Sequence, residues 1–202
     1  MSAIPSTRRY TVDEYFELDQ SSDTRYEYVY GYVVAMAGAS PEHELILTNL
    51  SAQIGPQLRK KRVCRIYGSN LRTQIKKNGR YAYPDAVIVC GDIKTGHQQT
   101  LLNPTIVVEV LSSSTKSYDL NDKGDDYRKI ASLKDIIYIY QDRPGVTIVS
   151  RQDDQWVIKD YEQLSDTVEL TSIEATLSLS DLYDQIDFPP SEDEEPFIED
   201  NG

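Results

Sequence analysis

The sequence predicts a single α/β (α+β) domain with a mixed β-sheet flanked by helices, preceded by an N-terminal helix and hairpin. Three β-branched runs predict the central strands: 86–90 (AVIVC), 105–111 (TIVVEVL) and 136–140 (IIYIY). Each run is nearly continuous, as in strands that are covered on both faces. A helix-length stretch separates the last two runs, so we expect a strand–helix–strand crossover and a parallel pair within the sheet.

The N-terminal elements follow from capping and turn residues. Thr11 and Glu14 form a capping-box pattern that opens a short helix. Segments 26–29 and 32–36 flank Tyr30–Gly31, which is typical of a hairpin. Ser40 before Pro41 then predicts the start of a second helix, with its apolar face at Leu45, Ile46, Leu50, Ile54 and Leu58. Gly55–Pro56 is expected to kink this helix or to end it early.

Turn and capping residues also mark the remaining elements. Segments 63–67 and 70–76 resemble strands, and Asn78–Gly79 predicts a tight turn after them. Asp119 is the expected N-cap of the crossover helix, whose apolar points are Tyr127, Ile130 and Leu133. Segments 147–149 and 156–158 predict a further hairpin.

Composition excludes several classes of protein. The chain has 202 residues, of which 39% are hydrophobic, which is too many for a disordered chain and too few for a membrane bundle. There is no apolar run of about 20 residues, so a spanning helix is not expected. The first ten residues lack an apolar signal-peptide core, which predicts a cytoplasmic protein. Cys64 and Cys90 are therefore expected to be buried free thiols in a reducing compartment.

The charge is unevenly distributed. The formal net charge is −12, and nine of the 33 acids but no base lie in residues 181–202, so that the rest of the chain is nearly neutral. We therefore expect a domain over residues 1–188 and a disordered acidic tail over residues 189–202. The tail is either a solubilising segment or a decoy that competes with nucleic acid for the protein's own basic surface.

Residues 59–80 have the opposite character, with nine of the 21 bases and no acid. Such a run is either a solvated face or a patch that contacts phosphates, because release of counterions favours clustered bases. In the second case the predicted DNA contacts are Arg59, Lys60, Lys61, Arg62, Arg72 and Lys76.

Two carboxylates are candidate metal ligands. Glu109 lies in the middle of a strand expected to be covered, where a lone charge must be paired, ligated or protonated. Asp85 stands at the entry of the preceding strand, and the two acids approach one another if these strands are neighbours. A divalent cation would then offset their repulsion, and oxygen ligands suit Mg²⁺ or Mn²⁺. The alternative is that Glu109 faces solvent on an edge strand.

Three further residues are candidates for the functional site, and each could instead have a purely structural role. Lys123 lies near the start of the crossover helix, from which it could reach the strand ends to orient water or stabilise charge on a phosphate; otherwise it is a solvated lysine. His43 is either an accessory ligand of phosphate or of the metal's waters, or a capping residue. Ser112 either binds phosphate or turns the chain.

Several ordered segments resemble one known family. The segments PDAVIVC, PTIVVEVLSSSTKSYDLNDKGDDYRKI and DIIYIYQDR are similar to those of Uma-type restriction endonucleases, within the PD-(D/E)XK nuclease superfamily. The resemblance covers residues 8–182 and implies a restriction-endonuclease-like core. It also implies that Asp85 and Glu109 bind Mg²⁺ or Mn²⁺, that Val110 lends its backbone carbonyl, that Lys123 is the displaced catalytic lysine, and that Glu27 assists.

The leading hypothesis is therefore a metal-dependent endonuclease that hydrolyses DNA, expected to be a homodimer. Two rivals retain the same fold. One is a non-catalytic nucleic-acid-binding module, and the other is a homo-oligomeric interaction protein in which Glu109 is neutral or paired across an interface.

Overall fold

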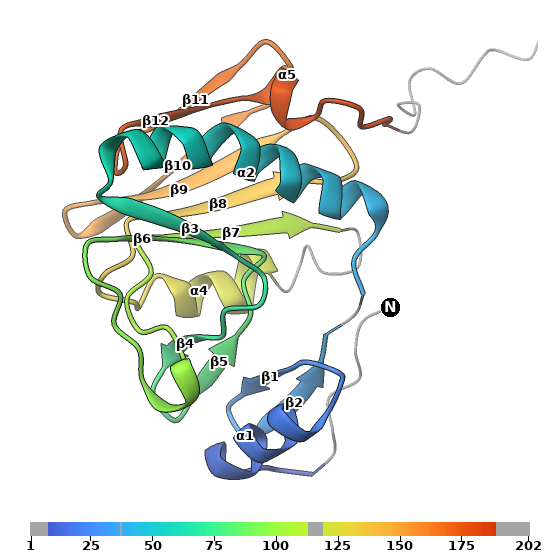
Figure 1. Cartoon of the computed structure of the whole chain (residues 1–202), viewed down its shortest axis with the longest axis vertical. Helices are drawn as coiled ribbons and strands as arrows, with labels where there is room; N and C mark the ends of the chain where they lie inside the picture. Colours follow the sequence, from blue (N-terminus) through green and yellow to red (C-terminus); the bar gives the residue numbers. More distant parts are fainter. Residues whose placement is uncertain (1–7, 37, 113–118, 189–202) are drawn as a thin grey trace, which may run out of the picture.

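The computed structural model describes residues 8–36, 38–112 and 119–188 (Figure 1). The predicted tail, residues 189–202, lies outside this part of the chain. Figure 1 shows a layered arrangement in which a large sheet has helix α2 on one face and helix α4 on the other. The smaller sheet and helix α1 lie beyond α4, at the bottom of that view.

Six strands form the large sheet, in the spatial order β10-β9-β8-β7-β6-β3. Their bounds are β3 (Cys64–Gly68), β6 (Ala86–Cys90), β7 (Ile106–Leu111), β8 (Asp135–Tyr140), β9 (Val146–Gln152) and β10 (Gln155–Tyr161). The β7–β8 pair is parallel and all other pairs are antiparallel. The expected mixed sheet and its crossover are thus confirmed, as are the three central strands.

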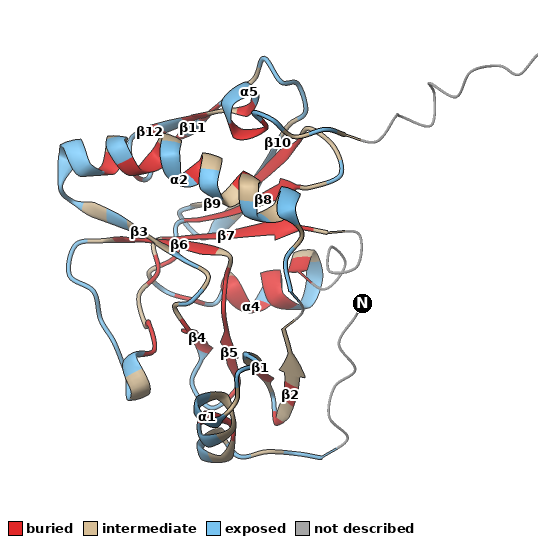
Figure 2. Ribbon diagram, turned by 45° about the vertical axis from the view of Figure 1, so that its right-hand side comes forward, coloured by how far each residue is buried: buried red, intermediate tan, exposed pale blue. Residues whose placement is uncertain are grey.

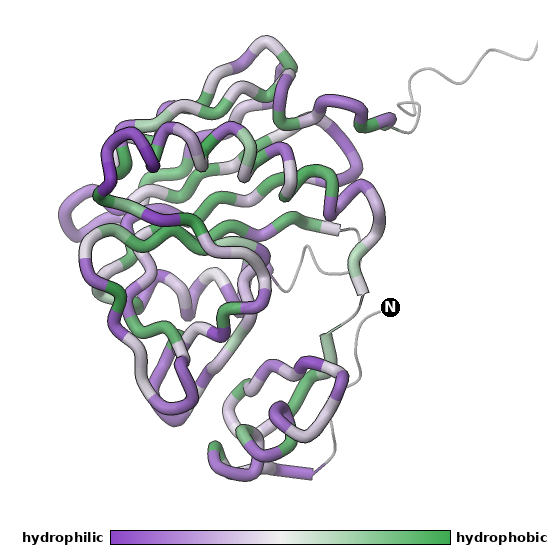
Figure 3. The backbone as a smooth tube through the Cα atoms, in the orientation of Figure 1, coloured by the Kyte–Doolittle hydropathy of each residue, from purple (hydrophilic) through white to green (hydrophobic). Residues whose placement is uncertain are grey.

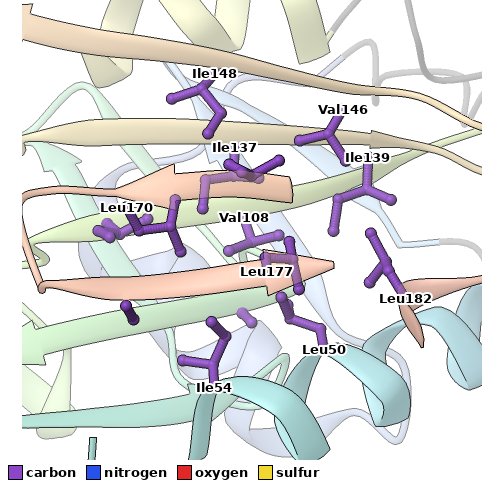
Figure 4. Close-up of a cluster of buried hydrophobic side chains, with 14 of the residues drawn as sticks. Leu50, Ile54, Val108, Ile137, Ile139, Val146, Ile148, Leu170, Leu177 and Leu182 are labelled. Carbon is purple, nitrogen blue, oxygen red and sulfur yellow. The ribbon is translucent and has the colours of Figure 1, made fainter. Parts of the chain in front are cut away.

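Alternating side chains of the central strands enter two different cores. In β7, Ile106, Val108 and Val110 join the cluster under α2, whereas Val107 and Leu111 join the cluster on the α4 side. Figure 4 shows the first cluster, in which Leu50 and Ile54 of α2 meet Val108 and Ile137 of the sheet. Because side chains alternate along a strand, Glu109 points to the same face as Val107 and Leu111. That face is covered by α4, so Glu109 is placed inside the protein.

The smaller sheet has four strands in the order β2-β1-β5-β4 and is packed against the first helix. The bounds are α1 (Val12–Ser21), β1 (Tyr26–Val29), β2 (Tyr32–Ala35), β4 (Thr73–Lys76) and β5 (Arg80–Ala82). Thr11 caps α1 through the predicted capping box with Glu14. The predicted hairpin at Tyr30–Gly31 and the turn at Asn78–Gly79 are both present.

Helix α2 (Pro41–Lys61) begins at the predicted N-cap, Ser40, and continues through Pro56. Of the two outcomes expected at Gly55–Pro56, a kink or an early end, the early end is therefore wrong. Ile54 and Leu58, one on each side of this pair, are buried against the sheet, and tertiary packing of this kind outweighs the local helix-breaking tendency of proline.

The crossover segment differs from the prediction at its start. Asp119 is not an N-cap but the first residue of a π-helical turn, η2 (Asp119–Lys123), which leads directly into α4 (Gly124–Tyr127). A capping preference is a local signal, and it cannot distinguish a cap from a wide turn whose carboxylate is buried by tertiary contacts.

The prediction of free thiols is also wrong. Cys64 and Cys90 form a disulfide that joins the paired strands β3 and β6, where the two residues are directly opposite one another. The 26-residue separation in sequence gave no sign of this pairing. It arises from the register of the two strands.

The C-terminal part of the domain adds three elements that the sequence patterns did not predict. These are β11 (Thr167–Leu170), β12 (Ala175–Ser178) and α5 (Leu179–Leu182). The short 3₁₀ turn η1 (His97–Gln99), earlier in the chain, was not predicted either. Figures 2 and 3 show buried and hydrophobic segments concentrated in the central strands of the large sheet. Among the described residues, none of the helices is both long and apolar enough to span a membrane.

Candidate active site

Asp85 and Glu109 converge because their strands are antiparallel neighbours. Ala86 pairs with Val108, so the next step of this register places Asp85 beside Glu109. The Val110 backbone N–H donates a hydrogen bond of 2.7 Å to Asp85 Oδ2, which fixes this carboxylate at the end of the β6–β7 ladder. The approach of these two acids, which was expected only if the strands were neighbours, is therefore present.

Glu109 is buried, with only 4% of its surface exposed. The alternative of a solvent-facing edge strand is wrong, because β7 lies between β6 and β8. The Tyr127 hydroxyl donates a hydrogen bond to Glu109 Oε1. Burial raises the pKa of Glu109 well above its ordinary value against the opposing effect of Lys123, and the nearby Asp119 and Asp85 carboxylates raise it further.

Lys123 lies against these carboxylates rather than in solvent, and is 5% exposed. Its Nζ is 2.9 Å from Glu109 Oε1 and 3.1 Å from Glu27 Oε1. Burial by itself would lower the pKa of Lys123, but Glu109 and Glu27 outweigh it and hold this pKa well above the ordinary value. Lys123 is therefore a protonated ammonium, and the reading of a solvated helix lysine is wrong.

Glu27 and Asp119 complete the surroundings of this ammonium. Glu27, from β1, is buried, and its Oε1 also accepts a hydrogen bond of 3.3 Å from the Tyr83 backbone N–H. Asp119 Oδ1 lies 3.7 Å from Lys123 Nζ across the η2 turn. Three carboxylates thus surround one ammonium, and a fourth, Asp85, lies close by.

His43 is on the more exposed side of the cluster. Its Nε2 is 3.2 Å from Asp85 Oδ2, and the exposed fractions of these two side chains are 14% and 16%. Burial would lower the pKa of His43, but the hydrogen bond and charge of Asp85 outweigh it and raise this pKa above its ordinary value. The His43 backbone N–H is bound by the Ser40 cap, so the residue serves the helix start and the cluster together.

The donor set suits a hard divalent cation. Among the described residues, no three His, Cys, Asp or Glu side chains are grouped as metal ligands. Mg²⁺, however, is ordinarily held by one or two carboxylates with several waters. Among the described residues, Val110 and His43 contact Asp85 through Oδ2, and Tyr127 and Lys123 contact Glu109 through Oε1. The oxygen chemistry of Asp85 and Glu109 therefore fits Mg²⁺ or Mn²⁺, and binding of the ion, like the part of the Val110 carbonyl in it, stays a prediction.

The other predicted site residues are dispersed. Ser112 directly follows the end of β7 and is half-buried, and its role in binding phosphate stays a prediction. Sequence reasoning missed Asp119 and Tyr127 as partners of the site. The i, i+4 spacing of each to Lys123 on a helical segment was the available signal.

The basic segment does not form one surface. Arg72 is buried, where Asp19 lies 2.7 Å from its Nη1 and the Phe16 ring lies under its guanidinium. The prediction that Arg72 contacts DNA therefore conflicts with its position. Arg59, Lys60, Lys61 and Arg62 are exposed at the C-terminal end of α2, and Lys76 is exposed beside Tyr30. At 1.5 Å per residue, this end of α2 is about 25 Å along the helix from His43.

Three comparisons place the chain among known proteins. A sequence model of the Uma2 family, described as "Putative restriction endonuclease", matches residues 12–181. Uncharacterized protein slr1290 of Synechocystis sp. strain PCC 6803 is 31% identical over 172 residues, which cover 85% of this chain and 90% of the relative. Uncharacterized protein sll1609 of the same strain is 29% identical over 143 residues, covering 70% and 80%.

A solved structure has the same fold. It is a protein of Anabaena variabilis described as a putative nuclease belonging to DUF820, with a TM-score of 0.71. The match covers 87% of this chain and 98% of that one at 17% identity. The expected restriction-endonuclease-like architecture, a mixed sheet flanked by helices, is thereby confirmed.

Proposed function

We propose that this chain, which belongs to the Uma2 family of restriction endonucleases, is a metal-dependent endonuclease that hydrolyses DNA phosphodiester bonds. The observation that carries the proposal is the convergence of Asp85, Glu109 and Lys123 at one end of the β6–β7 pair. Two carboxylates beside one buried ammonium are the groups that such a hydrolysis requires.

Each residue has a role that follows from its contacts. Asp85 and Glu109 would hold Mg²⁺ or Mn²⁺, assisted by the Val110 carbonyl. When bound, the cation supplies Lewis-acid stabilisation of the charge that develops on the phosphate. Tyr127 and Lys123 fix the orientation of Glu109 through its Oε1.

Lys123 would act on the substrate directly. An ammonium has three N–H donors, and Glu109 and Glu27 take two of them. Asp119 Oδ1, at 3.7 Å, is beyond hydrogen-bonding distance. The third donor would bind a phosphate oxygen or orient the attacking water, and in a buried site such an interaction is stronger than in water. Asp85 and His43 are the more exposed members, so the phosphate would enter from their side.

Plasmid cleavage tests this proposal. We expect supercoiled DNA to be nicked with Mg²⁺ or Mn²⁺ and not with EDTA. Asp85→Asn, Glu109→Gln and Lys123→Met should each lower the rate by about 100-fold or more. Asp92→Asn and Lys94→Met are matched controls, because both residues are exposed and lie beyond the other end of β6.

Two outcomes would contradict the assignment. If the site variants cleave as fast as the wild type, these residues are not the active site. If the wild type binds DNA in a salt-sensitive way without cleaving it under any divalent cation, the chain is a binding module with a nuclease fold. A homodimer, like a cytoplasmic location, stays a prediction, and sedimentation equilibrium measures the first.

A further inference from the structure

A second buried charged cluster lies next to Lys123. Its centre is Asp126 on α4, which is 4% exposed. The Tyr30 hydroxyl donates to both Asp126 oxygens, at 2.8 and 2.9 Å. Arg80 Nε lies 3.3 Å from Asp126 Oδ2, and Lys129 Nζ lies 2.7 Å from Oδ1.

Arg80 connects this cluster to the backbone beside Lys123. While its Nε is within ion-pair distance of Asp126, its Nη1 donates a hydrogen bond of 2.9 Å to the carbonyl of Asp122, the residue before Lys123. This carbonyl belongs to the π-helical turn η2, a form that is rare and marginal without outside support. A buried arginine from β5 therefore holds the turn that carries Lys123.

The contacts between the hairpin and the helical segment form two parallel links. Glu27 and Tyr30 are three residues apart at the β1–β2 hairpin, and Lys123 and Asp126 are three residues apart at the η2–α4 junction. Glu27 binds Lys123, and Tyr30 binds Asp126. Because the two links are at different points, they fix the orientation of the helical segment relative to the hairpin as well as the distance between the two.

We propose that Tyr30, Arg80 and Asp126 are positioning residues that set the place of the Lys123 ammonium relative to Glu109. The proposal rests on the function proposed above, since it concerns the same lysine. None of the three touches the reacting atoms. They act by fixing the backbone on both sides of Lys123, and a displacement of about 1 Å in a catalytic group can reduce a rate about 100-fold.

The chain offers variants that separate positioning from charge. Arg80→Lys keeps a positive charge beside Asp126 but lacks the planar fork that also reaches the Asp122 carbonyl. Tyr30→Phe removes one hydroxyl and retains the ring. Lys129→Gln is the matched control, because Lys129 binds the same carboxylate from a side chain that is 60% exposed.

The first measurement is the NMR signal of the Lys123 side-chain ammonium, assigned by its loss in Lys123→Met. We expect this signal to shift or broaden in Arg80→Lys and Tyr30→Phe and to stay in place in Lys129→Gln. An unchanged signal in the first two variants, or an equal change in the control, would overturn the proposal. This readout requires no cleavage, so it stands apart from the test of the nuclease function.

The second measurement is plasmid cleavage by the same variants. Arg80→Lys and Tyr30→Phe should lower kcat by about 10- to 100-fold with little change in KM, while Lys129→Gln stays within about twofold of the wild type. A rise in KM with unchanged kcat would overturn positioning. If the wild type does not cleave but the ammonium signal responds as described, positioning holds and the nuclease assignment fails.

Discussion

Gly124 shows how one residue places the candidate lysine. A Cβ at this position would lie 2.6 Å from the Tyr138 hydroxyl and 3.2 Å from the Asp119 carbonyl. The Tyr138 hydroxyl in turn donates to the Asp119 carbonyl, across the η2 turn. Glycine is therefore required for the close contact between the start of α4 and the sheet, although it is a poor helix former.

We predict that Gly124→Ala destabilises the protein, even though alanine favours a helix by about 1 kcal/mol. The clash with Tyr138 should displace α4 and lower the urea midpoint of unfolding. Tyr138→Phe removes the nearest atom, so Gly124→Ala should be much less harmful in that background. If the effect of Gly124→Ala is the same in both backgrounds, the contact with Tyr138 is not its cause.

At the scale of elements, the junction between the hairpin and α4 depends on an ionised Asp126. Burial alone would raise its pKa, but hydrogen bonds from Lys129 and Tyr30 and the charge of Arg80 outweigh it and lower this pKa below its ordinary value. A carboxyl with a lowered folded pKa contributes stability above the unfolded pKa, and loses it as the pH falls through the folded value.

We therefore predict that Asp126→Asn is less stable than the wild type at pH 7, and that this difference shrinks as the pH falls below about 4, the ordinary pKa of aspartate. Urea unfolding at a series of pH values measures it. Asp125→Asn, an exposed neighbour, should show no such trend. A difference that is constant from pH 7 to pH 3 would mean that the loss comes from packing and not from charge.

The β3–β6 pair carries the disulfide between Cys64 and Cys90. A crosslink of this kind typically contributes about 2–4 kcal/mol, largely by restricting the unfolded chain. We predict that a reductant lowers the free energy of unfolding by that amount in the wild type and has no effect on the double variant Cys64→Ala/Cys90→Ala. Equal sensitivity of both proteins would argue against the disulfide.

At the scale of the whole molecule, the bases of residues 59–80 include a buried pair and an exposed cluster. Arg72 and Arg80 are buried and hold the smaller sheet to its neighbours. Arg59, Lys60 and Lys61 form the exposed last turn of α2, where they also complement the negative end of the helix dipole. In the proposed nuclease, contacts with DNA phosphates would therefore fall to exposed bases such as these.

We predict that Arg59→Gln, Lys60→Gln and Arg62→Gln each make DNA binding less salt-dependent, by about 0.9 in the slope of log K against log salt for each lost phosphate contact. The free energy of unfolding should fall by no more than about 1 kcal/mol in each, the contribution of one charge at a helix end. Arg72→Gln should do the opposite, with a loss of about 3–5 kcal/mol of stability from breaking a buried ion pair and no change in slope. Unchanged slopes in the exposed variants would place the DNA elsewhere.

The sequence by itself determined the main elements, because their signals are local. β-branched runs predicted β6, β7 and β8, and the Thr11–Glu14 capping box predicted α1. The buried charge of Glu109 marked the site, since a carboxylate in a covered strand requires a partner. The short strands β11 and β12 carried too few residues to show a period.

Only the tertiary structure decided which partner Glu109 has and which bases are buried. Glu109, Lys123 and Glu27 are contributed by three separate segments, and strand register together with the packing of α4 brings them within hydrogen-bonding distance. The pairing of Cys64 with Cys90 is likewise a consequence of register. Contacts between residues far apart in sequence depend on how the layers stack, and no local pattern contains that information.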